Sequence, residues 1–138
     1  MSAPFVCEVP VRFADVDHAG VVYYPQYLDY CHVAFEEFMR AGLGKPYSGV
    51  VREEGLGYPA VRLECDYTAP SRFGDVLRIA VTCTGLGTKS VTLRYRIECA
   101  GELRVDAHVT TACIDMAEFS ALPIPAAHRR HFEAHAAS

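Results

Sequence analysis

Apolar and polar residues alternate along five segments of the chain, at residues 5–13, 61–69, 76–84, 90–99 and 102–114. This period of two predicts β-strands that each have one apolar and one polar face. Short turns at 85–87 and 100–101 lie between the last three segments, so we expect antiparallel hairpins there. Pro10 falls on the opposite phase of the first segment, which indicates an unpaired strand edge at that point.

One segment, residues 25–41, has a helical period instead. Its apolar residues recur at i, i+3, i+4 and i+7, and they are Tyr27, Tyr30, Cys31, Ala34, Phe35, Phe38 and Met39. This spacing predicts a helix with one apolar face, which Gly42, Gly44 and Pro46 bring to an end. Glu36 and Glu37 fall off that face, so we expect them in solvent.

The remaining segments are less regular. Residues 47–58 are predicted to form a loop with room for a short helical turn, and a short helix after Pro125 is predicted to carry the chain to Ser138. One long helix is therefore available to cover the apolar face of the sheet. The pattern predicts an α+β fold, in which a five-stranded antiparallel sheet wraps around one long central helix.

Composition narrows the class of protein. The chain has 138 residues, of which 51% are apolar, so we expect one domain spanning residues 1–138. The net charge of −4 does not favour a nucleic acid or an anionic membrane as partner. No apolar run is long enough to span a bilayer, and the first four residues lack signal-peptide character, so we expect a cytoplasmic protein. The six cysteines form no CxxC pair and are interpreted as reduced core residues.

Candidate chemistry gathers just before the long helix. Asp17 lies in a loop that contains Gly20 and leads into Pro25, a residue suited to the first position of a helix. Tyr24 would then be the N-cap, and tyrosine has no short side-chain oxygen to cap the first turn. The free N–H groups of the helix start could receive a carbonyl oxygen as it gains negative charge. Asp17 could attack that carbonyl or activate a water, and the sequence leaves both roles open.

The same stretch resembles the 4-hydroxybenzoyl-CoA thioesterase family of the hotdog fold. The matching pattern is Phe13-x-Asp15-x-Asp17-x-Ala19-Gly20-x-Val22-x-Tyr24-Pro25-x-Tyr27. The resemblance implies an acyl-CoA thioester hydrolase that needs no cofactor and works as a homo-oligomer, a dimer or a homotetramer built as a dimer of dimers. It implies that Asp17 is the catalytic carboxylate and that the N–H of Tyr24 is the oxyanion donor, while Asp15 has a structural role. It implies substrate-binding positions at His18, Gly20, Val22, Tyr27, His32, Lys89 and Ser90, with Lys89 near the CoA phosphates.

The acyl group is expected to be compact, either aromatic or short, because aromatic side chains of the helix can wall a bounded pocket. The chain departs from the family at His32, where the resemblance leads us to expect an acidic residue that receives a ring hydroxyl. A neutral imidazole can still accept a hydrogen bond, and its cation could meet a carboxyl group.

Three other interpretations compete with this one. Asp15, Asp17 and His18 are possible metal ligands, but adjacent residues rarely converge on one ion, so no metal is predicted. His128, His131 and His135 share one face of the terminal helix, which we interpret as a solvated face. A hotdog dehydratase would need a histidine beside its carboxylate, and a non-catalytic acyl-CoA binding module would not need Asp17.

Overall fold

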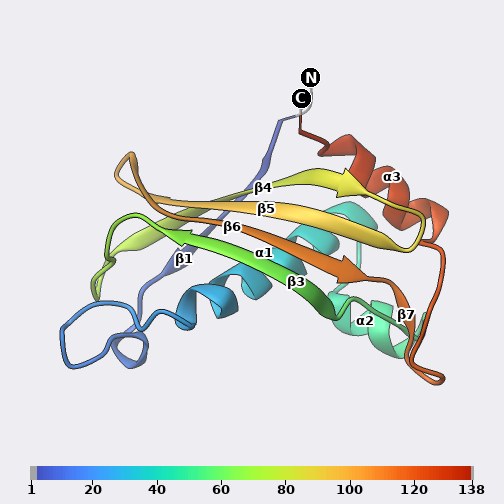
Figure 1. Ribbon diagram of the computed structural model, residues 1–138, viewed down its shortest axis with the longest axis horizontal. Helices are drawn as coiled ribbons and strands as arrows, with labels where there is room; N and C mark the ends of the chain where they lie inside the picture. The colour runs from blue at the N-terminus through green and yellow to red at the C-terminus, as the bar shows by residue number, and fades with distance from the viewer. Residues whose placement is uncertain (1–2, 138) are drawn as a thin grey trace.

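The computed structural model describes residues 3–137 and contains one main sheet of five antiparallel strands (Figure 1). The strand order is β1–β4–β5–β6–β3. The strands are β1 Phe5–Pro10, β3 Ala60–Tyr67, β4 Val76–Leu86, β5 Ser90–Cys99 and β6 Glu102–Ala112. The predicted number of strands, their antiparallel pairing and the position of β1 at an edge of the sheet are therefore confirmed.

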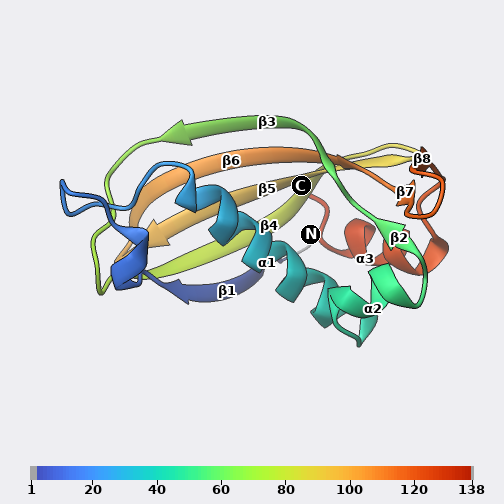
Figure 2. The same cartoon turned by 90° about the horizontal axis from the view of Figure 1, so that it is seen from below.

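The long helix α1, Gln26–Leu43, lies against one face of this sheet (Figure 2). All seven residues of the predicted apolar face are buried, whereas Glu36 and Glu37 are exposed, as predicted. The helix packs on β1 and β4, where the rings of Phe5 and Phe38 meet edge to face at 5.7 Å. It ends at Gly44, whose φ of +70° is the left-handed conformation of a helix C-cap.

Strand β3 is only partly covered by α1. Three residues of its predicted apolar face, Val61, Leu63 and Tyr67, are 63%, 45% and 47% exposed, although their alternation with polar residues predicts a buried face. A bulge between Ala60 and Arg62 also takes Val61 out of the alternation. The strand also forms one edge of the sheet, so its outer backbone groups have no neighbouring strand within residues 3–137. In this single chain, one face and one edge of β3 are thus left open.

The structure corrects several predicted boundaries. The first strand ends at Pro10 instead of residue 13, because the chain turns there into a short 3₁₀ helix, η1 Phe13–Asp15. The last predicted strand, 102–114, ends at Ala112, and its final residue, Ile114, belongs to β7. A second sheet, in the order β2–β7–β8, was not predicted, since its strands have only two residues each: Leu56–Gly57, Ile114–Asp115 and Ser120–Ala121.

Two short helices complete the described residues. Helix α2, Tyr47–Arg52, confirms the helical turn expected within 47–58, and α3, Ala126–Ala134, confirms the C-terminal helix. Helix α3 packs closely on α1, because a Cβ at Gly42 would meet the ring of His131. The two N-terminal residues and Ser138, the predicted end of the last helix, lie outside the described residues. Among residues 3–137, no helix combines the length and apolar character needed to cross a membrane.

Candidate active site

The side chain of Asp17 lies exposed in the loop of residues 15–23, which we call the carboxylate loop. Its Oδ1 accepts a hydrogen bond from the Ala19 N–H at 2.8 Å, and Gly20 follows with a left-handed φ of +79°. The other oxygen, Oδ2, accepts no hydrogen bond within residues 3–137. One oxygen therefore shapes the turn while the other is free for a substrate or a water. His18 is exposed in the same loop.

Asp15, by contrast, is already engaged by the protein. Its Oδ2 accepts hydrogen bonds from the Arg12 N–H at 2.9 Å and from the Tyr30 hydroxyl at 2.7 Å. Burial, followed by the neighbouring Asp15 carboxylate, raises the pKa of Tyr30, so this phenol stays a donor. Since Tyr30 lies on the buried face of α1, Asp15 ties the carboxylate loop to the helix. This geometry agrees with the structural role predicted for Asp15.

The start of α1 differs from the prediction by one residue. Pro25, not Tyr24, is the N-cap, with a φ of −70° and a ψ of −18°. The prediction failed because a tight turn, closed by the Gln26 N–H on the Tyr23 carbonyl at 2.8 Å, precedes the helix. The N–H of Tyr24 still donates no hydrogen bond within residues 3–137. The predicted oxyanion donor is thus free, although it lies one residue ahead of the cap.

A hollow of about 340 Å³ opens beside this helix start. Val22, Tyr24 and Tyr27 line it from the carboxylate loop and α1, and residues 67–70 line it from the end of β3. The Tyr67 hydroxyl donates to the Tyr24 carbonyl at 3.0 Å, which fixes the strand end against the helix start. Three of the predicted site residues therefore share one hollow.

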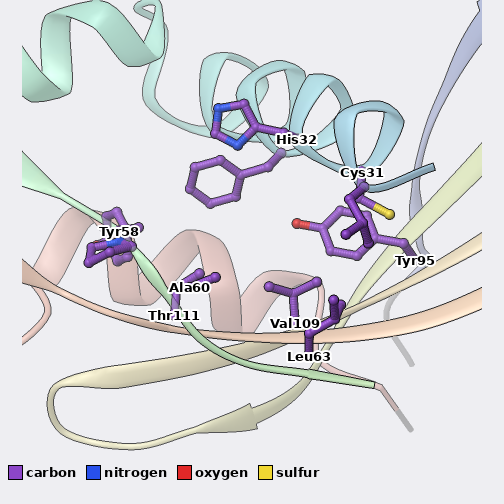
Figure 3. A pocket seen from close by; sticks show the side chains of 11 residues that line it. Cys31, His32, Tyr58, Ala60, Leu63, Tyr95, Val109 and Thr111 are labelled. Carbon is purple, nitrogen blue, oxygen red and sulfur yellow. The ribbon is translucent and has the colours of Figure 1, made fainter. Parts of the chain in front are cut away.

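A second, more enclosed cavity of about 280 Å³ lies farther along α1, between the helix and strands β3 and β6 (Figure 3). Its walls are largely apolar, and they come from Leu28, Cys31, Phe35, Tyr58, Pro59, Ala60, Leu63, Tyr95, Val109 and Thr111. His32 completes the lining at the surface, where its Nε2 lies 3.0 Å from Glu36 Oε2. Asp17 does not line this cavity in the single chain.

Lys89 and Ser90 lie at the opposite end of the sheet from the carboxylate loop. Residues beside Ser90 align with the Ala60 end of β3, through the shared partner strand β6. The Tyr24 backbone is bonded instead to Tyr67, at the far end of β3. Within one chain, therefore, the structure does not bring the predicted phosphate-binding residues together with the carboxylate loop.

The histidines of α3 are buried, so the predicted solvated face is wrong. His128 and His131 are only 1% and 8% exposed. The His131 Nε2–H donates to the Phe38 carbonyl at 2.7 Å, and burial lowers the pKa of His131. His135 Nδ1 lies 3.0 Å from the Ala3 carbonyl. The spacing showed that these residues share a face, but not that this face packs on α1. Among the described residues, no three His, Cys, Asp or Glu side chains gather as a metal site.

Sequence reasoning also missed a buried hydrogen-bond network behind the cavity. The Tyr58 hydroxyl lies 2.7 Å from His128 Nδ1, and His128 Nε2 lies 3.0 Å from Glu54 Oε1. Because a carboxylate only accepts, Nε2 carries the proton and the Tyr58 hydroxyl donates. Burial favours a higher pKa for Glu54, but the hydrogen bonds from Lys45 and His128 outweigh it and lower the pKa. Tyr58 and His128 are 70 positions apart, so no local pattern signals their contact.

Comparison with known proteins places the chain in a family. Residues 11–132 match the family model of the thioesterase-like superfamily. The chain belongs to this superfamily. This thioesterase-like chain is 33% identical over 116 residues to a 1,4-dihydroxy-2-naphthoyl-CoA hydrolase from Synechococcus elongatus, covering 83% of this chain and 85% of that protein. A hydrolase of the same name from Synechocystis is 30% identical over 123 residues, covering 88% of each chain.

Solved structures give the same picture. The 1,4-dihydroxy-2-naphthoyl-CoA thioesterase from Synechocystis superposes with a TM-score of 0.84 at 28% identity, covering 93% of this chain and 94% of that one. A gentisyl-coenzyme A thioesterase superposes with a TM-score of 0.83 at 29% identity, covering 91% and 99%. These relatives confirm the predicted hotdog fold and the prediction of an acyl-CoA thioester hydrolase. They support the superfamily, and not specifically the 4-hydroxybenzoyl-CoA family that the sequence resembles.

Proposed function

We propose that this chain hydrolyses the CoA thioesters of compact aromatic or short acyl groups to the free acid and CoA. The names of its relatives support an aromatic acyl group, since they act on dihydroxynaphthoyl-CoA and gentisyl-CoA. The cavity beside α1 supports a compact one. Its volume of about 280 Å³ is at the lower end of the ~300–1,000 Å³ typical of ligand pockets.

We propose that Asp17 and Tyr24 catalyse the thioester hydrolysis. The observation that carries this proposal is that the Asp17 Oδ2 and the Tyr24 N–H are both unengaged within residues 3–137 and that Asp17 is exposed. Asp15 is half-buried instead, and its Oδ2 is held by the Arg12 N–H and the Tyr30 hydroxyl. The Tyr24 N–H would donate to the thioester carbonyl oxygen as negative charge develops on it. The position of Tyr24 supports this role, because Pro25, the N-cap of α1, follows it directly and a helix N-terminus carries a partial positive charge.

Two routes remain open for the carboxylate. As a nucleophile, Asp17 forms a bond to the carbonyl carbon, the C–S bond breaks, CoA leaves as thiolate, and water then hydrolyses the mixed anhydride. As a general base, it takes a proton from a water that attacks the same carbon, and CoA leaves when the tetrahedral intermediate collapses. Both routes yield one acid and one CoA per water consumed.

We propose that the working form is a homodimer paired along β3. The open edge of β3 and its exposed residues Val61, Leu63 and Tyr67 support this arrangement, because a second copy would cover both. A two-fold axis across an antiparallel strand pair places opposite ends of the two strands side by side. The Tyr67 end of one copy, which holds the helix start, would therefore lie beside the Ala60 end of the other, which borders the cavity and leads toward Lys89.

Such a dimer would combine parts that a single chain keeps apart. The carboxylate loop of one copy would face the cavity of the other, where His32 lines the wall. Lys89 and Ser90 would then lie near the CoA arm of a substrate bound at that shared site, with His18 and Gly20 near its thioester. Two such dimers could assemble further into a tetramer, as the resemblance to the hydroxybenzoyl enzymes suggests.

The test is the release of CoA thiol, followed with a thiol-reactive dye, from benzoyl, hydroxybenzoyl, phenylacetyl, butyryl and palmitoyl CoA. We expect kcat/KM to favour the compact thioesters over palmitoyl-CoA by tenfold or more, which is about 1.4 kcal/mol of transition-state binding. A tenfold preference for palmitoyl-CoA would contradict the compact pocket. Binding of acyl-CoA without thiol release from any member of the panel would show a non-catalytic binding module instead.

A further inference from the structure

Tyr95 is a buried residue whose hydroxyl faces the cavity beside α1 and has no hydrogen-bond partner within the described residues. Tyr95 lies in the middle of β5 and is 3% exposed, and its hydroxyl makes no hydrogen bond within residues 3–137. Figure 3 shows the hydroxyl oxygen of Tyr95 pointing into the cavity, away from its own strand. The ring is buried, but the hydroxyl oxygen itself faces the open space of the cavity, where a ligand could reach it.

Other inward-facing phenols of the chain do have partners. The hydroxyls of Tyr30, Tyr58 and Tyr67 bond to Asp15, His128 and the Tyr24 carbonyl, and the hydroxyl of Tyr47 accepts from the Tyr58 N–H. Within residues 3–137, the buried tyrosines whose hydroxyls stay unpaired are Tyr27 and Tyr95, and both line a hollow of the candidate site. An unpaired hydroxyl is therefore a property of the site and not of the core in general.

A second unpaired oxygen lies in the same wall. Thr111 on β6 lines the cavity and is 9% exposed, and its Oγ1 is buried without a hydrogen-bond partner within the described residues. Phe35, Leu63 and Val109 make the surrounding wall apolar. Because the Thr111 Oγ1 is itself buried, the Tyr95 hydroxyl is the oxygen of this pair that a ligand in the cavity could reach, and such a group suits a flat apolar ligand with its own polar substituent.

We propose that the Tyr95 hydroxyl selects acyl-CoA substrates whose aromatic ring has a hydroxyl group. This inference rests on the proposed function and names the residue that sets its substrate class. A phenol both donates and accepts, and so does a ring hydroxyl, so the two can pair in either sense. An unsubstituted ring or an aliphatic chain would leave Tyr95 unpaired in the complex as well.

Charge also favours a neutral hydroxyl as the partner. Burial raises the pKa of Tyr95 well above its ordinary value, so the side chain remains an uncharged phenol. A carboxylate placed deep among these apolar walls would lose its hydration with only one neutral donor in return, which is unfavourable. A ring hydroxyl loses less hydration and regains a hydrogen bond, so it is the better fit to this part of the cavity.

The experiment compares Tyr95→Phe with the wild type on benzoyl-CoA and on mono- and dihydroxybenzoyl-CoA. The wild type is expected to prefer a hydroxylated thioester, and Tyr95→Phe to reduce that preference in kcat/KM by roughly tenfold or more. The loss of kcat/KM should be smaller on benzoyl-CoA than on the hydroxylated thioesters. The melting temperature should be unchanged or higher, since the substitution removes no internal hydrogen bond.

Tyr58→Phe is the matched control, because it removes a hydroxyl from the lining of the same cavity. That hydroxyl bonds to His128, so its loss should lower the melting temperature and leave the preference for hydroxylated rings in place. An unchanged preference in Tyr95→Phe overturns the inference, and so does an equal loss on every thioester. Both outcomes leave the thioesterase proposal standing.

A binding measurement keeps the inference testable if no thioester is hydrolysed, which would overturn the proposed function alone. Benzoate and dihydroxybenzoate are titrated into the wild type and Tyr95→Phe by calorimetry. The inference requires the dihydroxy acid to bind more tightly to the wild type, with that advantage lost in the variant. Equal affinities, or no binding of either acid to the wild type, overturn it.

Discussion

The two aspartates of the carboxylate loop are expected to respond in opposite ways to the same substitution. Asp17→Asn keeps an Oδ1 that can accept the Ala19 N–H, now at 2.8 Å, and the side chain is exposed. We therefore expect the free energy of unfolding to change by less than about 0.5 kcal/mol. Turnover should fall by about 10³-fold or more, or ~4 kcal/mol, because an amide is neither a nucleophile nor a base here.

Asp15→Asn should act mainly on stability. The carboxylate accepts hydrogen bonds from the Arg12 N–H at 2.9 Å and from the Tyr30 hydroxyl at 2.7 Å, and an amide oxygen accepts both without the charge. Charge-assisted bonds are worth roughly 1 kcal/mol more than neutral ones, so the substitution should cost about 2 kcal/mol. For 138 residues at roughly 2.1 cal/mol/K each, the melting temperature should fall by about 7 °C.

Thermal melts followed by circular dichroism and thiol release at saturating acyl-CoA measure both effects on the same samples. The loss of turnover in Asp15→Asn should be much smaller than in Asp17→Asn. Retention of more than about a tenth of wild-type turnover in Asp17→Asn would refute the assigned role. A large loss of turnover in Asp15→Asn, with an unchanged melting temperature, would transfer that role to Asp15.

Three further predictions concern assembly and stability. Val61→Asp on the open edge strand β3 should shift sedimentation toward the 15.2 kDa monomer and remove activity. Val6→Asp on the other edge strand, β1, should have neither effect. A fully active monomer would contradict the proposed dimer. His128→Phe should lower the melting temperature by about 7–14 °C, because the buried Tyr58 and the more exposed Glu54 each lose a bond worth ~1–2 kcal/mol. A change under about 2 °C would argue against the network. Hydrogen bonds from Arg94 lower the pKa of Asp106, so this carboxylate adds stability above about pH 4 that is lost as the pH falls further. Asp106→Asn should therefore flatten the dependence of the unfolding free energy on pH in that acidic range. An unchanged slope would contradict the lowered pKa.

Much of the fold could be predicted because its signals are local. Each strand of the main sheet shows its period within about ten residues, and the buried face of α1 was predicted residue by residue. The predicted boundaries of strands and helices were less accurate, because the effect of a proline depends on the backbone conformation around it, which the apolar pattern does not show. Pro10 ends a strand that the alternation would continue, and a turn at Tyr23 delays the helix to Gln26.

The candidate site likewise has residues with a local sequence signal and residues without one. Asp17 and Tyr24 could be proposed from sequence because they lie within one short stretch ahead of one helix. Tyr95 and Thr111 could not, because their strands predict only that they point inward, and not that a cavity leaves their oxygens unpaired. The buried role of His128 depends on a contact 70 positions away, which spacing within α3 cannot indicate.

Strand β3 shows how a sequence pattern can be correct and yet remain unsatisfied in one chain. Its alternation predicts a buried apolar face, but α1 packs on β1 and β4 and leaves Val61, Leu63 and Tyr67 open to solvent. Exposure of that apolar face to water is unfavourable for the single chain. Pairing β3 with a second copy would bury the face and would also close the free edge of the strand. The same pairing would bring the carboxylate loop of one copy to the cavity of the other. The apolar face of β3 and the separation of the two halves of the site therefore have one common explanation, and the Val61→Asp experiment tests both at once.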